Sequence, residues 1–217
     1  MIEAVIFDCD GVLVDSEALS NQALSEALGE AGLEMSPIEC RAQFMGRSWA
    51  NCLEVIEERM GREAPQELEE SYRRRMRQAF ERDLRAVPGV EDALDRIELP
   101  TCVASSGPPS KIRLTLGLTG LWPRFEGRIF SAREVEQGKP APDLFLHAAA
   151  QMGWEPGGCA VVEDAPVGVE AAVAAGMAAF GYAGDGDAPA LEAAGARVFT
   201  DMSELPELLS RPAYTGN

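Results

Sequence analysis

The sequence predicts an α/β protein with a Rossmann-like parallel sheet as its core and a small inserted α-helical cap domain. The main observation is an alternation, in which short apolar runs recur and each is followed by a segment with helical spacing. The runs are AVIF at 4–7, TCVA at 101–104, RIF at 128–130, CAVV at 159–162, MAAFGY at 177–182 and ARVF at 196–199. The second observation is a break in this alternation, because only helical signals occur from Glu17 to about Leu84.

The stretch after the first run predicts three helices. The first has an apolar i, i+3, i+4, i+7 stripe and can end at Gly32. Ser48 can cap the second, which can end at Gly61. The third can begin at Pro65 and continue through the basic cluster YRRRMR at 72–77.

These helices predict an inserted domain over residues 16–86, within a core formed by 1–15 and 87–217. The hinges are expected at 14–16 and at 86–89, where Pro88-Gly89 interrupts the chain. Ligands of such a core are expected beyond the carboxyl ends of its strands.

The composition favours a soluble, cytoplasmic protein that is a monomer or small homo-oligomer. A formal charge of -17 disfavours nucleic acid and anionic membranes as partners and favours a small metabolite bound at a local positive site. Five cysteines without a CxxC pair fit a reducing compartment, and no signal peptide pattern is present. The single histidine, His147, lies in a helical stripe, which disfavours Ser-His-Asp triads and histidine-rich zinc sites.

The stretch FDCDGVLVDSE at 7–17 places two carboxylates at the end of the first run. Asp8 and Asp10 are two residues apart, so in extended chain they share a face, and Gly11 lets the chain turn away. Alone, such a pair is more typical of a polar strand end or a helix cap than of a functional site.

Three further runs also end in polar residues. Ser105-Ser106-Gly107 follows the second run and precedes a helix start, an arrangement that suits either a helix cap or an anion site. Lys139 lies in GKPAPD beyond the third run and is one of only two lysines. Glu163-Asp164 follows the fourth run and leads into an Ala-rich helix.

The four sites together favour phosphoryl chemistry over simple capping. Four converging carboxylates repel one another unless a cation lies among them, and oxygen ligands select a hard ion such as Mg²⁺. With Mg²⁺ and Lys139, the site could neutralise and orient a phosphoryl group.

The motifs DCDGVLVD, ASSG, GKPAPD and VVEDAPVG resemble those of the haloacid dehalogenase superfamily, over nearly the whole chain. The order and the helical insert resemble the branch with an α-helical cap that includes β-phosphoglucomutase and phosphosugar phosphatases, with 6-phosphogluconate phosphatases as the most similar type.

This resemblance implies roles for the residues. Asp8 would be the nucleophile that forms an aspartyl-phosphate, and Asp10 the acid and base. Asp8, the carbonyl of Asp10 and Asp164 would hold Mg²⁺, with Glu163 as a direct or water-mediated ligand. The phosphoryl group would be held by Lys139 and by the turn formed by Ser105, Ser106 and Gly107.

In the cap, Gly46-Arg47 matches the position from which an arginine reaches the substrate, and a surface charge is the equal alternative for Arg47. A cap that closes over the substrate is expected.

The expected reaction is Mg²⁺-dependent hydrolysis of a small phosphomonoester, such as a phosphosugar or 6-phosphogluconate. A dehalogenase would lack Asp10, and a phosphonatase would need a cap lysine, which residues 17–84 do not contain. A β-phosphoglucomutase-type enzyme is the first alternative, although Ser20 stands where that branch carries a histidine. A phospho-acceptor receiver module is the non-enzymatic alternative.

Overall fold

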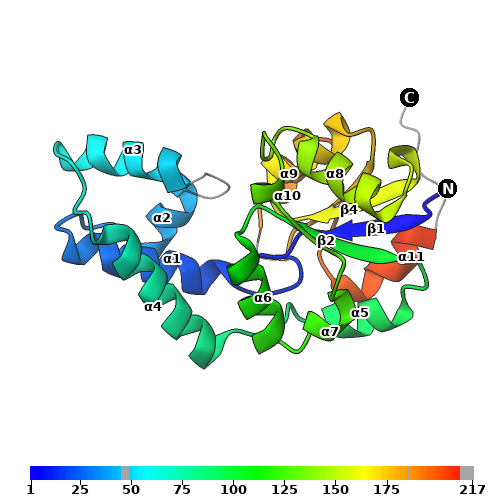
Figure 1. Ribbon diagram of the computed structural model, residues 1–217, viewed down its shortest axis with the longest axis horizontal. Helices are drawn as coiled ribbons and strands as arrows, with labels where there is room; N and C mark the ends of the chain where they lie inside the picture. Colours follow the sequence, from blue (N-terminus) through cyan, green and yellow to red (C-terminus); the bar gives the residue numbers. More distant parts are fainter. Residues whose placement is uncertain (45–48, 185, 211–217) are drawn as a thin grey trace. The chain divides into compact units, whose positions relative to one another are not determined.

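Six short strands form one parallel sheet in the computed structural model, which describes residues 1–44, 49–184 and 186–210. The strand order is β3-β2-β1-β4-β5-β6 (Figure 1). The strands are β1 (Ala4–Phe7), β2 (Thr101–Ser105), β3 (Ile129–Ser131), β4 (Cys159–Glu163), β5 (Ala178–Tyr182) and β6 (Arg197–Phe199). The predicted fold class is confirmed, since each strand coincides with one of the six apolar runs.

The first strand of the chain lies in the middle of the sheet. β1 pairs in parallel with β2 on one side and with β4 on the other. All four of its residues are buried, because helices cover both faces of a parallel sheet. The carboxyl ends of β2, β1 and β4 are therefore neighbours.

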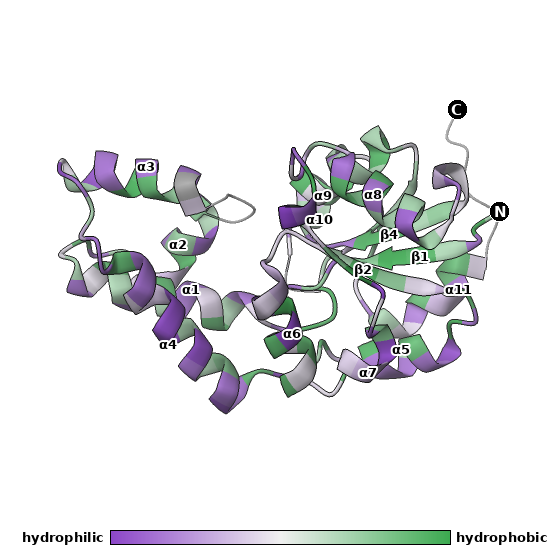
Figure 2. Ribbon diagram, viewed as in Figure 1, coloured by the Kyte–Doolittle hydropathy of each residue, from purple (hydrophilic) through white to green (hydrophobic). Residues whose placement is uncertain are grey.

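Helices cover the two faces of this sheet (Figure 1). The face above the sheet in the figure carries α8 (Asp143–Met152), α9 (Pro166–Ala174) and α10 (Ala188–Ala193). The opposite face carries α5 (Val90–Arg96), α6 (Pro109–Leu118), α7 (Trp122–Phe125) and α11 (Leu205–Ser210). Three 3₁₀ turns complete this part: η1 (Ala132–Glu134), η2 (Pro156–Gly158) and η3 (Met202–Glu204). Figure 2 shows β1 and β4 as apolar, in agreement with their burial.

The segment from Glu17 to Asp83 is helical, as expected from the sequence. Its helices are α1 (Glu17–Glu30), α2 (Pro37–Phe44), α3 (Trp49–Met60) and α4 (Leu68–Asp83). They enclose a separate apolar core that includes Leu28 and Ile56, and the rings of Trp49 and Tyr72 stack with centroids 5.4 Å apart. Helix α2 was not expected from the sequence, and α4 begins at Leu68 and not at Pro65.

The chain thus forms two compact units, of which one comprises Met1–Asp15 with Ala86–Asn217 and the other Ser16–Arg85. Ala86, which was expected in the insert, belongs to the core unit, because it forms an antiparallel bridge with Val14. Of the helices within the described residues, none has the length and apolar character needed to cross a bilayer.

Candidate active site

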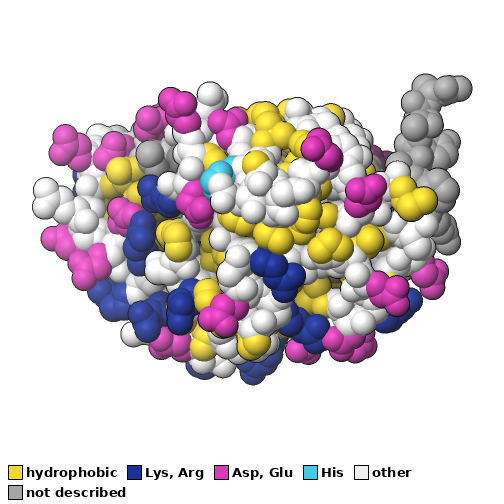
Figure 3. Space-filling view, turned by 45° about the vertical axis from the view of Figure 1, so that its right-hand side comes forward, with side chains coloured by type: hydrophobic (Ala, Val, Ile, Leu, Met, Phe, Trp, Pro, Cys, Tyr) yellow, Lys and Arg dark blue, Asp and Glu magenta, His cyan; other side chains and the backbone are white. Residues whose placement is uncertain are grey.

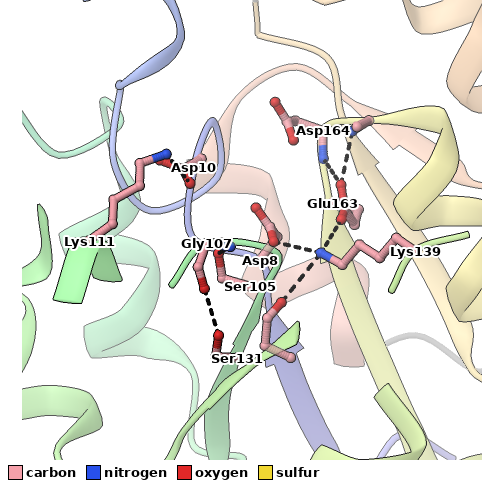
Figure 4. Close-up of polar contacts among 11 residues, drawn as sticks. Asp8, Asp10, Ser105, Gly107, Lys111, Ser131, Lys139, Glu163 and Asp164 are labelled. Atoms are coloured by element: carbon pink, nitrogen blue, oxygen red, sulfur yellow. Dashed lines mark hydrogen bonds and ion pairs between the residues drawn. The ribbon is translucent and has the colours of Figure 1, made fainter. Parts of the chain in front are cut away.

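Three neighbouring strands bring acidic and hydroxyl side chains to one edge of the sheet (Figure 4). Asp8 directly follows β1, Ser105 ends β2 and Glu163 ends β4. The N–H of Asp8 donates to the carbonyl of Val162 at 2.9 Å, so the ladder between β1 and β4 continues to the edge. All three polar residues are buried. Parallel pairing of apolar strands therefore positions these side chains.

Lys139 joins two of these carboxylates. Its Nζ lies 2.6 Å from Oδ1 of Asp8 and 2.6 Å from Oε1 of Glu163, and it donates to the carbonyl of Ala104 at 3.4 Å. The ammonium also lies 4.8 Å from the centroid of the Phe145 ring. Only 4% of the lysine side chain is exposed. A residue of the loop beyond β3 thus supplies a buried positive charge at the ends of β1 and β4.

Glu163 holds Lys139 from a fixed position. Its Oε2 accepts hydrogen bonds from the N–H groups of Asp164 and Ala165, both at 2.9 Å, while Oε1 accepts from Lys139. Both oxygens therefore have protein donors. Glu163 was expected from the sequence to be a direct or water-mediated metal ligand, and this stays a prediction; the protein contacts of its carboxylate are with Lys139 and with the N–H groups of Asp164 and Ala165.

Burial and the neighbouring charges together shift the pKa values of this cluster. Burial raises the pKa of Asp8 to about 7; Lys139 acts in the opposite direction, and the carboxylates of Glu163 and Asp10 raise it further. Burial lowers the pKa of Lys139, but the attraction of Asp8 and Glu163 is stronger and holds this pKa above its ordinary value. Lys139 is therefore a permanent cation, and an additional cation beside Asp8 would favour its carboxylate form.

Asp10 has a lysine partner that was not assigned from the sequence. Nζ of Lys111, on α6, donates to Oδ2 of Asp10 at 2.8 Å, and about a fifth of each side chain is exposed. The rarity of lysine, which drew attention to Lys139, applies equally to Lys111 and could have indicated it.

The turn after β2 is anchored from two directions. Oγ of Ser105 accepts the N–H of Gly107 at 3.1 Å, and Oγ of Ser131, at the end of β3, donates to the carbonyl of Gly107 at 2.7 Å. Ser106 is exposed at this turn. Ser131 is a second contributor that was not predicted from the sequence. The expected cap residues, Gly46 and Arg47, lie outside the described residues.

Asp164 lies against the loop that follows β1. Gly11 has a φ of +75°, and a Cβ atom at this position would lie 2.0 Å from Oδ2 of Asp164. Only glycine therefore allows the loop of Asp8 and Asp10 to approach this carboxylate so closely. In Figure 4, Asp8, Asp10 and Asp164 lie around one space at the edge of the sheet.

The oxygen donors fit a magnesium ion. Mg²⁺ is usually held by one or two carboxylates together with water and substrate phosphate, so a closed cage of protein ligands is not needed. Asp8 and Asp164 supply two carboxylates directly after the neighbouring strands β1 and β4, and Gly11 leaves room for Asp164 beside the loop that carries Asp8. Among the described residues, no three His, Cys, Asp or Glu side chains are already grouped as a metal site.

Neither Cys9 nor His147 is placed to act as a nucleophile or base in this cluster. Burial, together with the carboxylates of Asp10 and Asp8, raises the pKa of the Cys9 thiol well above its ordinary value, so this thiol stays neutral. Nε2 of His147, on α8, lies 3.3 Å from Oε2 of Glu134, so the imidazole pairs outside the cluster.

Known proteins resemble this chain in both sequence and fold. A family model described as haloacid dehalogenase-like hydrolase matches residues 2–176. A 6-phosphogluconate phosphatase of Escherichia coli is 33% identical over 95% of this chain and 94% of its own length. A conserved haloacid dehalogenase-like protein of unknown function from Agrobacterium tumefaciens has a TM-score of 0.86 and 36% identity, covering 97% of this chain and 98% of its own.

A further solved structure, of a family hydrolase from Deinococcus radiodurans with bound phosphate and sodium, has a TM-score of 0.79 and 30% identity. It covers 97% of this chain and 99% of its own. The match of the family model over most of the chain, together with this agreement in fold, shows that the protein belongs to the haloacid dehalogenase-like hydrolase family.

Proposed function

We propose that this hydrolase is a Mg²⁺-dependent phosphatase that cleaves small phosphorylated sugars or sugar acids through an aspartyl-phosphate on Asp8. The observation that carries the proposal is the buried ammonium of Lys139, which contacts Asp8 and Glu163 at the sheet edge where Ser105 also lies. A buried nucleophile beside a permanent cation suits an anionic electrophile such as a phosphate ester.

The residues of the cluster would divide the tasks of the reaction among them. A carboxylate oxygen of Asp8 forms a bond to phosphorus while the bond to the leaving alkoxide breaks. Lys139, Ser105, the N–H of Ser106 and the turn at Gly107 hold the phosphoryl oxygens.

Asp10 would act in both halves of the reaction. It gives its proton to the alkoxide, and it then takes a proton from the water whose oxygen attacks the aspartyl-phosphate. That attack releases inorganic phosphate and restores the carboxylate of Asp8.

Magnesium would be held by Asp8, Asp164 and the backbone carbonyl of Asp10, and when bound it would neutralise the phosphoryl oxygens as a Lewis acid. Glu163 is assigned to Lys139 in this proposal, because its two oxygens already accept three hydrogen bonds. The phosphate and sodium in the related Deinococcus radiodurans structure support a site of this kind.

The substrate class follows from similarity over the full length. The Escherichia coli 6-phosphogluconate phosphatase matches 95% of this chain, so the proposed substrates are phosphosugars and phosphorylated sugar acids. Recognition of the far end of the substrate by Arg47, under a cap that closes, remains a prediction.

The test is phosphate release from a panel of sugar phosphates and phosphorylated sugar acids that includes 6-phosphogluconate. We expect release from one small group of substrates, lost on addition of EDTA and in Asp8→Asn. Asp92→Asn, at an exposed position on α5, is the matched control and should retain activity. No release from any member by folded protein with Mg²⁺ would refute the proposal.

Asp10→Asn distinguishes a phosphatase, which turns over its aspartyl-phosphate, from a receiver module, which only accepts a phosphoryl group. Without the base for the second step, the covalent intermediate should accumulate on Asp8 and be visible by mass spectrometry of acid-quenched protein. A receiver module would instead show a long-lived phosphoprotein in the unsubstituted chain treated with acetyl phosphate.

A further inference from the structure

Gly168 occupies a position where the backbone conformation does not require glycine. It lies in α9, whose sequence PVGVEAAVA is otherwise rich in alanine and valine. Its φ is not among the positive values of the chain, so an L-amino acid could adopt the same backbone. Glycine within a helix is less favourable than alanine, because it loses more conformational freedom on folding. A specific contact should therefore explain its presence.

That contact is with the carboxyl group of Glu163. A Cβ atom at position 168 would lie 1.8 Å from Oε1 and 2.0 Å from Cδ of Glu163. Real carbon and oxygen atoms cannot approach so closely, so any side chain at this position would displace the carboxyl group.

Glu163 cannot move without loss. Its side chain is 2% exposed, and moving its carboxyl group would break the hydrogen bonds from Asp164 N–H, Ala165 N–H and Lys139. The buried carboxylate of Glu163 would then lose its ion pair with the ammonium of Lys139, which is strongly unfavourable. Lys139 would keep its ion pair with Asp8 and lose the one with Glu163, at the end of β4.

We propose that Gly168 is a positioning residue: the absence of its side chain creates the space in which Glu163 holds Lys139 against Asp8. The role of Lys139 in phosphoryl binding rests on the proposed function, whereas the steric link between Gly168 and Glu163 does not.

A double-mutant cycle tests this inference, with Gly168→Ala, Glu163→Ala and the double variant. Gly168→Ala alone should lower kcat/KM by about 100-fold, because a misplacement of about 1 Å at a reacting centre can cost that much. Once Glu163 is truncated, the added methyl group has room, so the double variant should match Glu163→Ala in kcat/KM.

Thermal stability gives a readout that needs no substrate. Gly168→Ala should lower Tm in the unsubstituted chain, because it displaces a buried carboxylate. In the Glu163→Ala background the same substitution should leave Tm unchanged or raise it, since alanine is the better helix former. A general packing defect would lower Tm equally in both backgrounds.

Gly117→Ala is the matched control. Gly117 is also helical, in α6, and a Cβ atom at this position would have no atom within 4 Å beyond its immediate surroundings. This variant should retain full kcat/KM and equal or higher Tm.

The inference is overturned if Gly168→Ala behaves like Gly117→Ala, or if it causes the same loss with and without Glu163. If the unsubstituted protein hydrolyses none of the panel, the proposed function fails, while the Tm cycle still decides the role of Gly168.

Discussion

At the scale of single residues, Lys139 is the group on which the described cluster depends. It is the only cation that contacts both Asp8 and Glu163 within the part of the chain that the structure describes. Two buried carboxylates on adjacent strands are tolerated because one ammonium lies 2.6 Å from each of them. Its charge thus has a structural purpose besides the proposed catalytic one.

Replacement of Lys139 should therefore lower stability as well as activity. Lys139→Met leaves two buried carboxylates without their partner, so we expect the free energy of unfolding to fall by about 3 to 5 kcal/mol. Urea unfolding at neutral pH without Mg²⁺ measures this.

The only other lysine provides the control. Lys111→Met removes a partly exposed ion pair with Asp10 and should cost about 1 kcal/mol or less. Equal losses in the two variants would contradict the assignment of Lys139 as the buried partner of both carboxylates.

The positions of Asp8, Ser105, Glu163 and Asp164 could be predicted from sequence, because strand ends in a parallel sheet meet at one edge. The hydrogen bonds of Glu163 could not be predicted from the sequence, because they depend on the side-chain conformation of this one carboxylate. Lys111 and Ser131 were missed although the sequence holds a signal for each: lysine is rare in this chain, and Ser131 directly follows the apolar run RIF at 128–130.

At the scale of elements, the strands were easier to predict than the helices. Buried parallel strands are continuous apolar runs, which stand out in a sequence. The missed helix α2 has eight residues, PIECRAQF, with little apolar periodicity. Its signal was the capping box, in which Ser36 N–H donates to Glu39 at 2.8 Å and Glu39 N–H donates to Oγ of Ser36 at 3.2 Å.

The loop after β1 yields a prediction at this scale. Gly11→Ala combines an unfavourable positive φ with a clash against Asp164, so we expect the Mg²⁺ concentration for half-maximal activity to rise about tenfold or more. Titration of activity with Mg²⁺ measures the effect.

Gly153→Ala isolates the cost of the backbone conformation. Gly153 has a φ of +72° at the end of α8, with no atom near a Cβ at this position, so Gly153→Ala should lose about 1 to 2 kcal/mol of stability through the backbone alone. Gly11→Ala should lose more, because its Cβ also clashes with Asp164. The same Mg²⁺ requirement in both variants would show that Gly11 does not position Asp164.

At the scale of the whole molecule, the chain carries a formal net charge of -17. Figure 3 shows acidic side chains scattered over one face of the protein. Such a charge destabilises the folded state by repulsion between like groups. The site cluster is partly protected from this effect, because Lys139 and Lys111 pair with its carboxylates.

Salt should therefore stabilise the protein. Raising the ionic strength from about 0.01 M to about 0.15 M shortens the screening length from about 30 Å to about 8 Å. We expect Tm to rise over this range, and to rise equally with sodium and tetramethylammonium chloride if screening is the cause. A constant or falling Tm would show that surface repulsion is not a significant term.

The central position of β1 has a consequence for the order in which the chain folds during synthesis. β1 is translated before both of its partners, Thr101–Ser105 (β2) and Cys159–Glu163 (β4). The helical unit Ser16–Arg85 has its own apolar core and is complete before either partner has been translated. A nascent chain therefore carries a complete helical unit while β1 has no partner until β2 emerges, and β1 lacks its second partner until β4 emerges. During that interval the apolar side chains of β1 are exposed, and chaperones have most to protect.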